Sequence, residues 1–470
     1  MKIALLCVSV WPRLARTGWG IAILGLAGGC ETYRSQPLTR AAVEQALETP
    51  SLAIVRMDAP KLNHRLVRAV AINGRDGFTP EEIAVMTVIA SPQLRALRDQ
   101  RGVAEAQVIQ AGLLPNPQLG YSLDHPHGNN DPTLVNGMGA GVSWDATALL
   151  GYRSRVAAAH GTVHALALDI AWQEWQAAET ARLTALRVLS LEERLPFARE
   201  TEAVMADAVA LERKAQARGY RTTVELAAMV EVWNGAQDAR FALEQELTTQ
   251  RLALNLALGQ PAMSEVKLRP GADFPALPTG PEAAAGLLDG FEKRRLDLVA
   301  LTLGYESAEA SLRTAVRAQF PKIGLSLGRA RDTSDVKTRT FGITLDLPVF
   351  DRSQGAIAVG AATRRQLFDD YTARVAEARS EVVQILANIA ITREQLRTVE
   401  TGLPEWEQLV VALDQAMKTR NTDVQAWRDA HGALLARRTL RAKLRQDLLE
   451  LGVGLEIATG LPDLTRSAAP

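Results

Sequence analysis

The two halves of the chain repeat one pattern at a nearly constant offset, and such a duplication constrains the fold more than any other feature. Leu94-Arg95-Ala96-Leu97 returns 204 residues later as Leu298-Val299-Ala300-Leu301. Further along, Gly141-Val142-Ser143-Trp144-Asp145 matches Gly342-Ile343-Thr344-Leu345-Asp346 at an offset of 201. A small insertion or deletion in the intervening loop explains the change of offset. The chain is therefore predicted to fold as two copies of one unit.

The duplication also divides the chain into segments. Gly259 and Gly460 keep the offset of 201 and mark the ends of the two copies. The predicted segments are a signal peptide (1–29), an N-terminal lipid-anchored segment (30–78), repeat 1 (79–259), a linker (260–280), repeat 2 (281–460) and a tail (461–470).

Each repeat is predicted to contain a helix, two strands, a very long helix and a second helix. Thr79-Pro80-Glu81-Glu82 has the composition of a helix start, with a capping threonine, a first-turn proline and a capping-box glutamate. Leu114-Pro115-Asn116-Pro117 ends this helix, because proline lacks an amide hydrogen and excludes the α conformation from its predecessor.

The strands are recognised by a hydrophobic period of two residues. Leu119, Tyr121 and Leu123 alternate with small or polar residues, the returning segment 138–145 does the same, and repeat 2 shows this alternation at 323–327 and 341–347. Such alternation is typical of membrane β-barrel strands. A soluble hairpin with one buried face is the alternative.

The long helix of repeat 2 carries a sustained heptad pattern. Its first set of apolar positions is Phe368, Val375, Val382, Ile389, Leu396, Leu403, Val410 and Met417, and its second is Ala378, Ile385, Val399, Trp406 and Leu413. A heptad of this length predicts coiled-coil packing against neighbouring helices. A helix over 352–418 would be about 100 Å long at 1.5 Å per residue, and Pro404 is expected to kink it.

Composition excludes several classes of function. The chain has 53 basic and 53 acidic residues, two cysteines and six histidines. A neutral balance without basic runs argues against nucleic-acid binding, and two cysteines cannot make a disulfide framework or a cysteine-rich metal site. His160 and His164 are four residues apart but lack a visible third ligand. We therefore expect no enzyme, no catalytic residues, no cofactor and no metal site.

The N-terminus has the features of an exported protein. Basic residues without any acid precede a short apolar stretch from Trp19 to Gly29, as in a secretory signal. Leu26-Ala27-Gly28-Gly29-Cys30 resembles the lipobox of bacterial lipoproteins, with Ala27 where leucine is usual. Cys30 is the predicted site of lipidation, a palmitate-bearing anchor, and an ordinary signal with an unrelated cysteine is the alternative.

Several motifs together resemble the TolC-like outer-membrane factors, in particular the lipoprotein type of outer-membrane efflux protein. They are Leu113-Leu114-Pro115-Asn116-Pro117 before the first hairpin, Phe320-Pro321 before the second, Leu345–Arg352 after it, and the ending Ala458-Thr459-Gly460-Leu461-Pro462. The resemblance covers about residues 80–460.

The resemblance implies a mainly α fold with a small β part: long antiparallel coiled-coil helices and four barrel strands per chain. A homotrimer would form a 12-stranded β-barrel and an α-helical periplasmic tunnel. The implied protein lies in the bacterial outer membrane, lipid-anchored and extending into the periplasm, in contact with outer-membrane lipid. Its implied partners are a periplasmic adaptor (membrane fusion) protein and an inner-membrane transporter.

The resulting functional prediction is the outer-membrane channel of a tripartite efflux system, which passively conducts what the transporter delivers. The exit duct of a type I protein secretion system is an alternative within the same class. A structural coiled-coil lipoprotein without a pore is an alternative from another class.

Candidate sites follow from the two hairpins and the two helical turns. Asp145 and Asp346 are equivalent residues on the polar side of the strands, and a trimer would place six such carboxylates in the barrel lumen. Capping of strand ends is the alternative role.

The heptad and helical patterns break at two equivalent turns. The resemblance implies that these turns, Gly219-Tyr220 and Asn421-Thr422, are the adaptor-docking tips. Thr223 and Asp423 are expected to cap the helices that follow. Asp414 lies about one turn before the second tip and is the candidate for an acidic aperture ring, with an ordinary solvated helix residue as the alternative.

Overall fold

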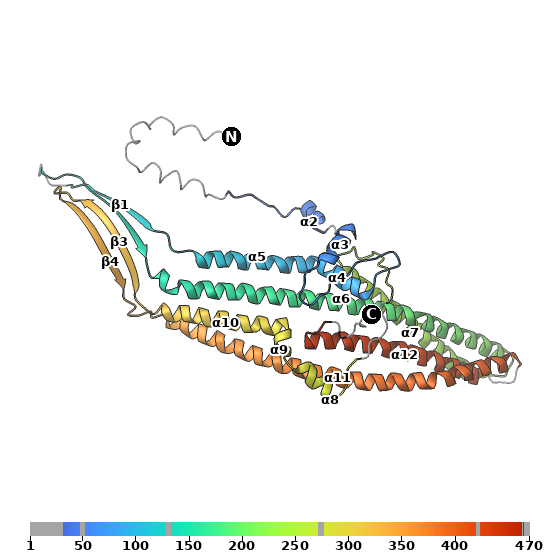
Figure 1. The fold of residues 1–470 in the computed structure, drawn as a ribbon. Coiled ribbons are helices and arrows are strands. Elements are labelled where there is room, and N and C mark those ends of the chain that lie inside the picture. The colour runs from blue at the N-terminus through green and yellow to red at the C-terminus, as the bar shows by residue number, and fades with distance from the viewer. Residues whose placement is uncertain are drawn as a thin grey trace. The chain divides into compact units, whose positions relative to one another are not determined.

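The computed structural model describes residues 32–47, 52–127, 133–270, 277–419, 424–462 and 464. The chain divides into two compact units, 1–48 and 49–470. In the first unit, helix α2 (Arg40–Leu47) carries an exposed ion pair between Arg40 and Glu44. All other elements belong to the second unit (Figure 1).

The second unit contains two successive sets of elements. A short entry segment is formed by α3 (Leu52–Asp58) and the 3-10 helix η1 (Ala59–Lys61). The first set is α4 (Pro80–Ala90), α5 (Pro92–Gly112), β1 (Gln118–Asp124), β2 (Gly137–Asp145), α6 (Ala148–Ala217) and α7 (Thr223–Ala257). The second is α8 (Pro281–Leu288), α9 (Phe291–Arg294), α10 (Leu296–Arg317), β3 (Lys322–Arg331), β4 (Lys337–Asp346), α11 (Gln354–Lys418) and α12 (Val424–Thr459). The predicted fold class, mainly helical with four strands, is confirmed.

The single helix predicted at the start of repeat 1 is broken into α4 and α5. Thr79 caps α4 in a reciprocal capping box with Glu82, as expected. Ser91 then adopts φ −61° and ψ 121° before Pro92, because the proline ring excludes α geometry from the preceding residue. In repeat 2, Arg295 makes the equivalent break between α9 and α10, although no proline follows it.

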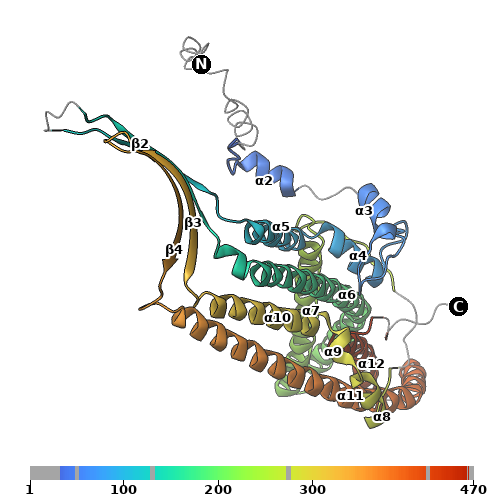
Figure 2. The ribbon, with the colours of Figure 1, turned by 60° about the vertical axis from the view of Figure 1, so that its left-hand side comes forward.

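The four strands form one antiparallel sheet in the order β1-β2-β3-β4. Figure 2 shows it as a continuous curved ribbon of strands. The central pair joins the two repeats, with Val142 opposite Leu327 and Trp144 opposite Leu325. The register therefore aligns the alternating side chains of all four strands on two common faces.

The long helices pack lengthwise. Helix α6 contacts α7, α10 and α12, and α11 contacts α10 and α12. The buried heptad residues of α11 are Ala378, Val382, Ile389, Val399, Leu403 and Val410. The heptad thus identifies the packed side of the helix, and α11 continues through Pro404 as one helix.

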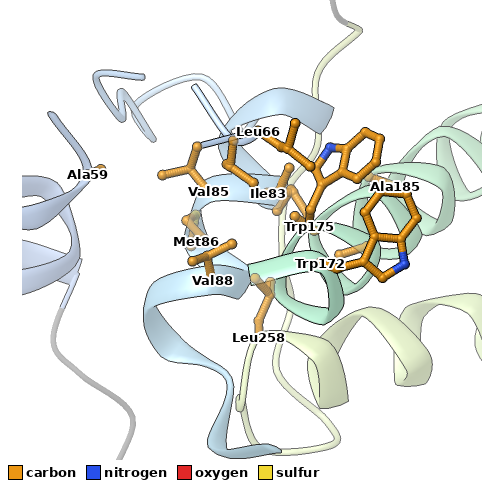
Figure 3. Packing of buried hydrophobic residues seen from close by; sticks show 14 of the residues in the cluster. Ala59, Leu66, Ile83, Val85, Met86, Val88, Trp172, Trp175, Ala185 and Leu258 are labelled. Carbon is orange, nitrogen blue, oxygen red and sulfur yellow. The ribbon is translucent and has the colours of Figure 1, made fainter. Parts of the chain in front are cut away.

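The largest hydrophobic cluster lies where α4 crosses α6 (Figure 3). Trp172 and Trp175 of α6 pack edge to face, with ring centroids 5.0 Å apart. Around them lie Ile83, Val85, Met86 and Val88 of α4, Leu258 at the end of α7, Ala59 of η1, and Leu66 of the loop that follows η1. Residues 30–78 were predicted to form one N-terminal segment, whereas their later part packs into this core.

The two repeats end in the same way. Gly259 (φ +64°) follows α7 and Gly460 (φ +69°) follows α12, both in the left-handed conformation that glycine adopts readily. A Cβ on Gly259 would lie 2.9 Å from Pro92 Cδ, and one on Gly460 would lie 3.1 Å from the Arg295 amide nitrogen. The final glycine of repeat 1 therefore packs against the break between α4 and α5, and that of repeat 2 packs against the break between α9 and α10.

Candidate functional site

The sheet has one apolar and one small-residue face. The apolar sheet face is formed by Leu119, Tyr121, Leu123, Met138, Ala140, Val142, Trp144, Ile323, Leu325, Leu327, Phe341, Ile343 and Leu345. Most of its large side chains are exposed within one chain, for example Leu119 at 73% and Phe341 at 67%. The opposite face carries mainly glycine, serine, threonine and aspartate. A sheet exposed on both sides, with apolar residues on one, suits a wall between lipid and water.

Both predicted lumen carboxylates lie on the small-residue face, at the strand ends nearest the helices. Asp145 is the last residue of β2 and pairs in register with Gly324, whereas Asp346 is the last residue of β4 and pairs with Lys322. Asp145 Oδ1 also accepts a hydrogen bond from the Thr147 amide at 2.9 Å. Asp145 therefore caps the turn into α6 from a position on the small-residue face, and the lumen role of both carboxylates stays a prediction.

The first predicted tip is a tight turn between α6 and α7. Gly219 has φ +77°, and its amide donates to Gln216 O at 2.9 Å. The Tyr220 amide donates to Ala215 O at 3.0 Å, and the phenol ring is exposed. This pattern satisfies the last carbonyls of α6 and turns the chain around.

Thr222, rather than the expected Thr223, caps α7. Its hydroxyl accepts from the Glu225 amide while Glu225 accepts from the Thr222 amide, so a capping box forms. The Thr222 amide and hydroxyl, followed by Arg221, lower the pKa of Glu225. The prediction of Thr223 was wrong because the glutamate three residues on selects Thr222 as its partner.

Helices α11 and α12 bracket the second predicted tip. Asn421 and Thr422 lie outside the described residues, as does the expected cap Asp423. Cys30 and the signal segment also lie outside them.

Two residues that were not among the predicted sites, Trp427 and His431, hold the aperture candidate Asp414. Its Oδ1 accepts from Trp427 Nε1 at 2.7 Å and lies 2.9 Å from His431 Nε2. Burial raises the pKa of Asp414, but the bonds from His431 and Trp427 outweigh burial and lower it. The carboxylate thus ties the end of α11 to the start of α12. The i, i+4 spacing of Trp427 and His431 on one face of α12 was the available signal.

Buried ionic contacts were also missed, including one between the repeats. Arg182 of α6 contacts Glu456 of α12 at 2.7 Å and Glu179 at 3.0 Å, with all three side chains buried. Arg295 binds both oxygens of Asp297, donates to Ala458 O at 3.0 Å and lies over the Trp172 ring at 4.9 Å. Of these contacts, Arg182–Glu456 and Arg295–Trp172 join the two repeats, whereas Arg295 holds Asp297 and Ala458 within repeat 2.

The described residues contain no group of three or more His, Cys, Asp or Glu side chains arranged to hold a metal ion. His160 and His164 stack on one another, with ring centroids 6.3 Å apart. In the same parts of the chain, no helix is long and apolar enough to cross a membrane.

Known outer membrane proteins resemble this chain in sequence and in fold. Residues 287–461, which cover most of repeat 2, match the family described as Outer membrane efflux protein. The chain is 23% identical over 467 residues to the pyoverdine export outer membrane protein OpmQ of Pseudomonas aeruginosa, covering 93% of this chain and 96% of the other. Repeat 2 therefore resembles the outer membrane efflux protein family. Members of this family are channels, not enzymes, and are typically trimers within tripartite efflux systems.

Solved outer membrane proteins share the fold. The CmeC outer membrane channel of Campylobacter jejuni matches with a TM-score of 0.67 and 12% identity, over 92% of this chain and 94% of the other. The outer membrane protein VceC of Vibrio cholerae matches with a TM-score of 0.64 and 16% identity, over 81% of this chain and 96% of the other. The chain thus shares its long-helix and four-strand fold with these outer membrane proteins over most of its length.

Proposed function

We propose that this efflux protein is one subunit of a trimeric outer membrane channel, in which three copies of the sheet close into one 12-stranded barrel. The single observation that supports this most is the four-stranded sheet with an exposed apolar face and open edges at β1 and β4. Open edges leave backbone groups without partners, which is not viable in lipid. Pairing β1 of one subunit with β4 of the next removes both edges.

The small-residue face would line the lumen. Glycine and serine leave space inside the barrel, and Asp145 and Asp346 would add six carboxylates at the end nearest the helices. Rings of carboxylates favour the passage of cations. The long helices would continue the lumen through the periplasm. This arrangement supports a pore rather than a coiled-coil lipoprotein of purely structural role.

The helical tips would meet the periplasmic adaptor that links the channel to an inner-membrane transporter. Gly219 and Tyr220 form an exposed turn of defined geometry, which supports the docking role. Asp414 would act at the aperture through its bonds to α12. The family description favours efflux over polypeptide secretion as the transport process.

We further propose that Cys30 is the acylated N-terminus of the mature protein, which adds a lipid anchor to the barrel. The change Cys30→Ser is expected to remove the lipid mass from the intact protein while trimers still insert, because the barrel itself holds the protein in the membrane. Loss of all trimers from the membrane would contradict this division of roles.

Cysteine cross-linking tests the closed barrel. Ser122→Cys on β1 is combined in turn with Thr338→Cys or Thr340→Cys on β4, and oxidation is expected to give covalent trimers. The control pair Ser143→Cys and Ser326→Cys lies on directly opposed residues of β2 and β3 and should link only within one chain. If the control forms and every edge pair gives monomers alone, the three subunits do not share one barrel.

A further inference from the structure

The apolar sheet face changes character near the hairpin turn of repeat 2. Beyond Leu327 on β3 the same face continues with Arg329 and Arg331, and beyond Phe341 on β4 it continues with Arg339 and Lys337. We call these four residues the basic rows. They lie at the strand ends away from the helices, because the long helices α6 and α11 begin at the opposite ends of the strands (Figure 1).

The register places like charges directly opposite each other. Arg329 pairs with Arg339 and Arg331 with Lys337, so each cross-strand pair is cationic. Like charges in direct opposition destabilise a sheet. Asp335 Oδ1 lies 2.5 Å from Arg331 Nε and compensates one of the four charges. Because the other three charges are not compensated by Asp335, an external anion would stabilise the basic rows.

The length of the apolar sheet face between the basic rows and the helices gives the depth of the basic rows in the membrane. Eight residues separate Arg339 from Leu347, or about 27 Å along a strand at 3.4 Å per residue. At a tilt of about 40° this is about 21 Å along the membrane normal, close to the apolar band of barrels at about 25 Å. Tyr121 lies in the same cross-strand row as Arg329, through Ala140, and aromatic side chains mark the membrane interface.

We propose that the basic rows bind the phosphate groups of a phosphorylated lipid in the outer leaflet, with its acyl chains along Phe341 and Leu327. This inference rests on the proposed barrel, in which the apolar sheet face contacts lipid and the hairpin turns lie outside the cell. Guanidinium groups bind phosphate through paired hydrogen bonds. Three subunits would present twelve such basic side chains around the barrel.

The neighbouring residues favour a lipid over a free anion. Arg329 and Arg339 are flanked by exposed Leu327 and Phe341, which offer contact to acyl chains and nothing to inorganic phosphate. The cations also lie on the face opposite Asp145 and Asp346, so they would not contact substrates in the lumen.

Lipid binding to the purified full-length trimer tests the proposal. Bisphosphorylated lipid A is titrated into the detergent-solubilised trimer, and bound lipid is counted by native mass spectrometry. The wild type is expected to bind it, and Arg329→Gln with Arg339→Gln is expected to weaken binding by about tenfold or more, because two charged contacts are lost. Lys337→Gln with Arg331→Gln provides a second, independent variant. Arg352→Gln, exposed beyond the other end of β4, is the matched control and should bind as wild type.

Two further ligands distinguish the source of the anion. Lipid A without its phosphates should bind weakly to the wild type, and millimolar inorganic phosphate should not displace the bound lipid. Equal binding by the wild type and both double variants, or displacement by phosphate, would overturn the inference. Channel conductance of the same samples separates the two proposals: a conducting trimer with charge-independent lipid binding refutes this inference alone, whereas a wild type without conductance refutes the channel.

Discussion

Arg182 Nη1 lies 2.7 Å from Glu456 Oε2, and this buried ion pair joins α6 of repeat 1 to α12 of repeat 2. Burial lowers the pKa of Arg182, but the charges of Glu179, Glu456 and Glu81 outweigh burial and raise it, so the guanidinium stays charged. Glu456 is 1% exposed and Arg182 is 3% exposed. The two repeats are therefore joined by a buried charge pair as well as by apolar packing.

Glu456→Gln is expected to destabilise the fold. Removing one partner of a buried ion pair leaves the other charge uncompensated, which costs about 3–5 kcal/mol. Because Glu179 and Glu81 still face Arg182, we expect the lower end, about 3 kcal/mol. Chemical denaturation of the purified trimer followed by circular dichroism measures this. The exposed Glu200→Gln on α6 is the control, and equal midpoints for both variants would show that the buried pair contributes nothing.

Asp414→Ala is expected to raise the conductance of the isolated trimer, because it releases the end of α11 from Trp427 and His431. Trp427→Phe removes only the indole N–H donor and should give a smaller rise, about half as large in free energy if each bond contributes about 1 kcal/mol. Asp429→Ala removes a carboxylate paired with its neighbour Arg428 and should leave conductance unchanged. Single-channel recording checks all three, and a rise with Asp429→Ala alone would place the aperture elsewhere.

The same contact predicts an acid-sensitive tip. The folded protein lowers the pKa of Asp414 from 3.8, so the stabilisation of the tip by this carboxylate is fully present above that value and is lost as pH falls through the lower folded pKa. Conductance of the wild type should therefore rise as pH falls below about 4. Asp414→Asn should lack this Asp414-dependent part of the rise. An identical acid response in both proteins would contradict the assignment to Asp414.

Gly219→Val is expected to weaken adaptor-dependent efflux without preventing trimer assembly. A Cβ at this position would meet no atom within 4 Å, so the cost comes from the backbone at φ +77°, about 1–2 kcal/mol for an L-residue. Gly235→Val in α7 is the control, since a Cβ there also meets no atom within 4 Å and its φ is not positive. Export of the transported substrate from cells reports efflux, and native gels report trimer assembly. Loss of trimers with Gly219→Val would mean that the turn acts in assembly.

The local elements of this fold could be predicted from the sequence. Alternation at Leu119 and Phe341 identified the apolar sheet face, and the heptad through Val382 and Ile389 identified the packed side of α11. These patterns depend on neighbours in the chain, so periodicity reveals them. The pair Arg182 and Glu456 was not predictable, because its partners are 274 residues apart and each residue alone resembles a solvated helix charge.

For the candidate site, too, the turns could be predicted from the sequence but the contacts between helices could not. Gly219 marked a turn because few other residues adopt a positive φ, whereas the choice of Thr222 over Thr223 depended on Glu225. The bonds of Asp414 to Trp427 and His431 cross a helical hairpin, and a one-residue change in the turn would alter them. Local conformation was therefore predicted, while contacts between helices required the structure.

Planar bilayer recording tests the central claim most directly. Purified full-length protein should raise membrane conductance in discrete, cation-selective steps, and Asp145→Asn with Asp346→Asn should shift the reversal potential in a salt gradient towards zero. Asp76→Asn, exposed before α4 and remote in sequence from both hairpins, should keep the wild-type reversal potential. A preparation that contains trimers but never raises conductance would contradict the channel.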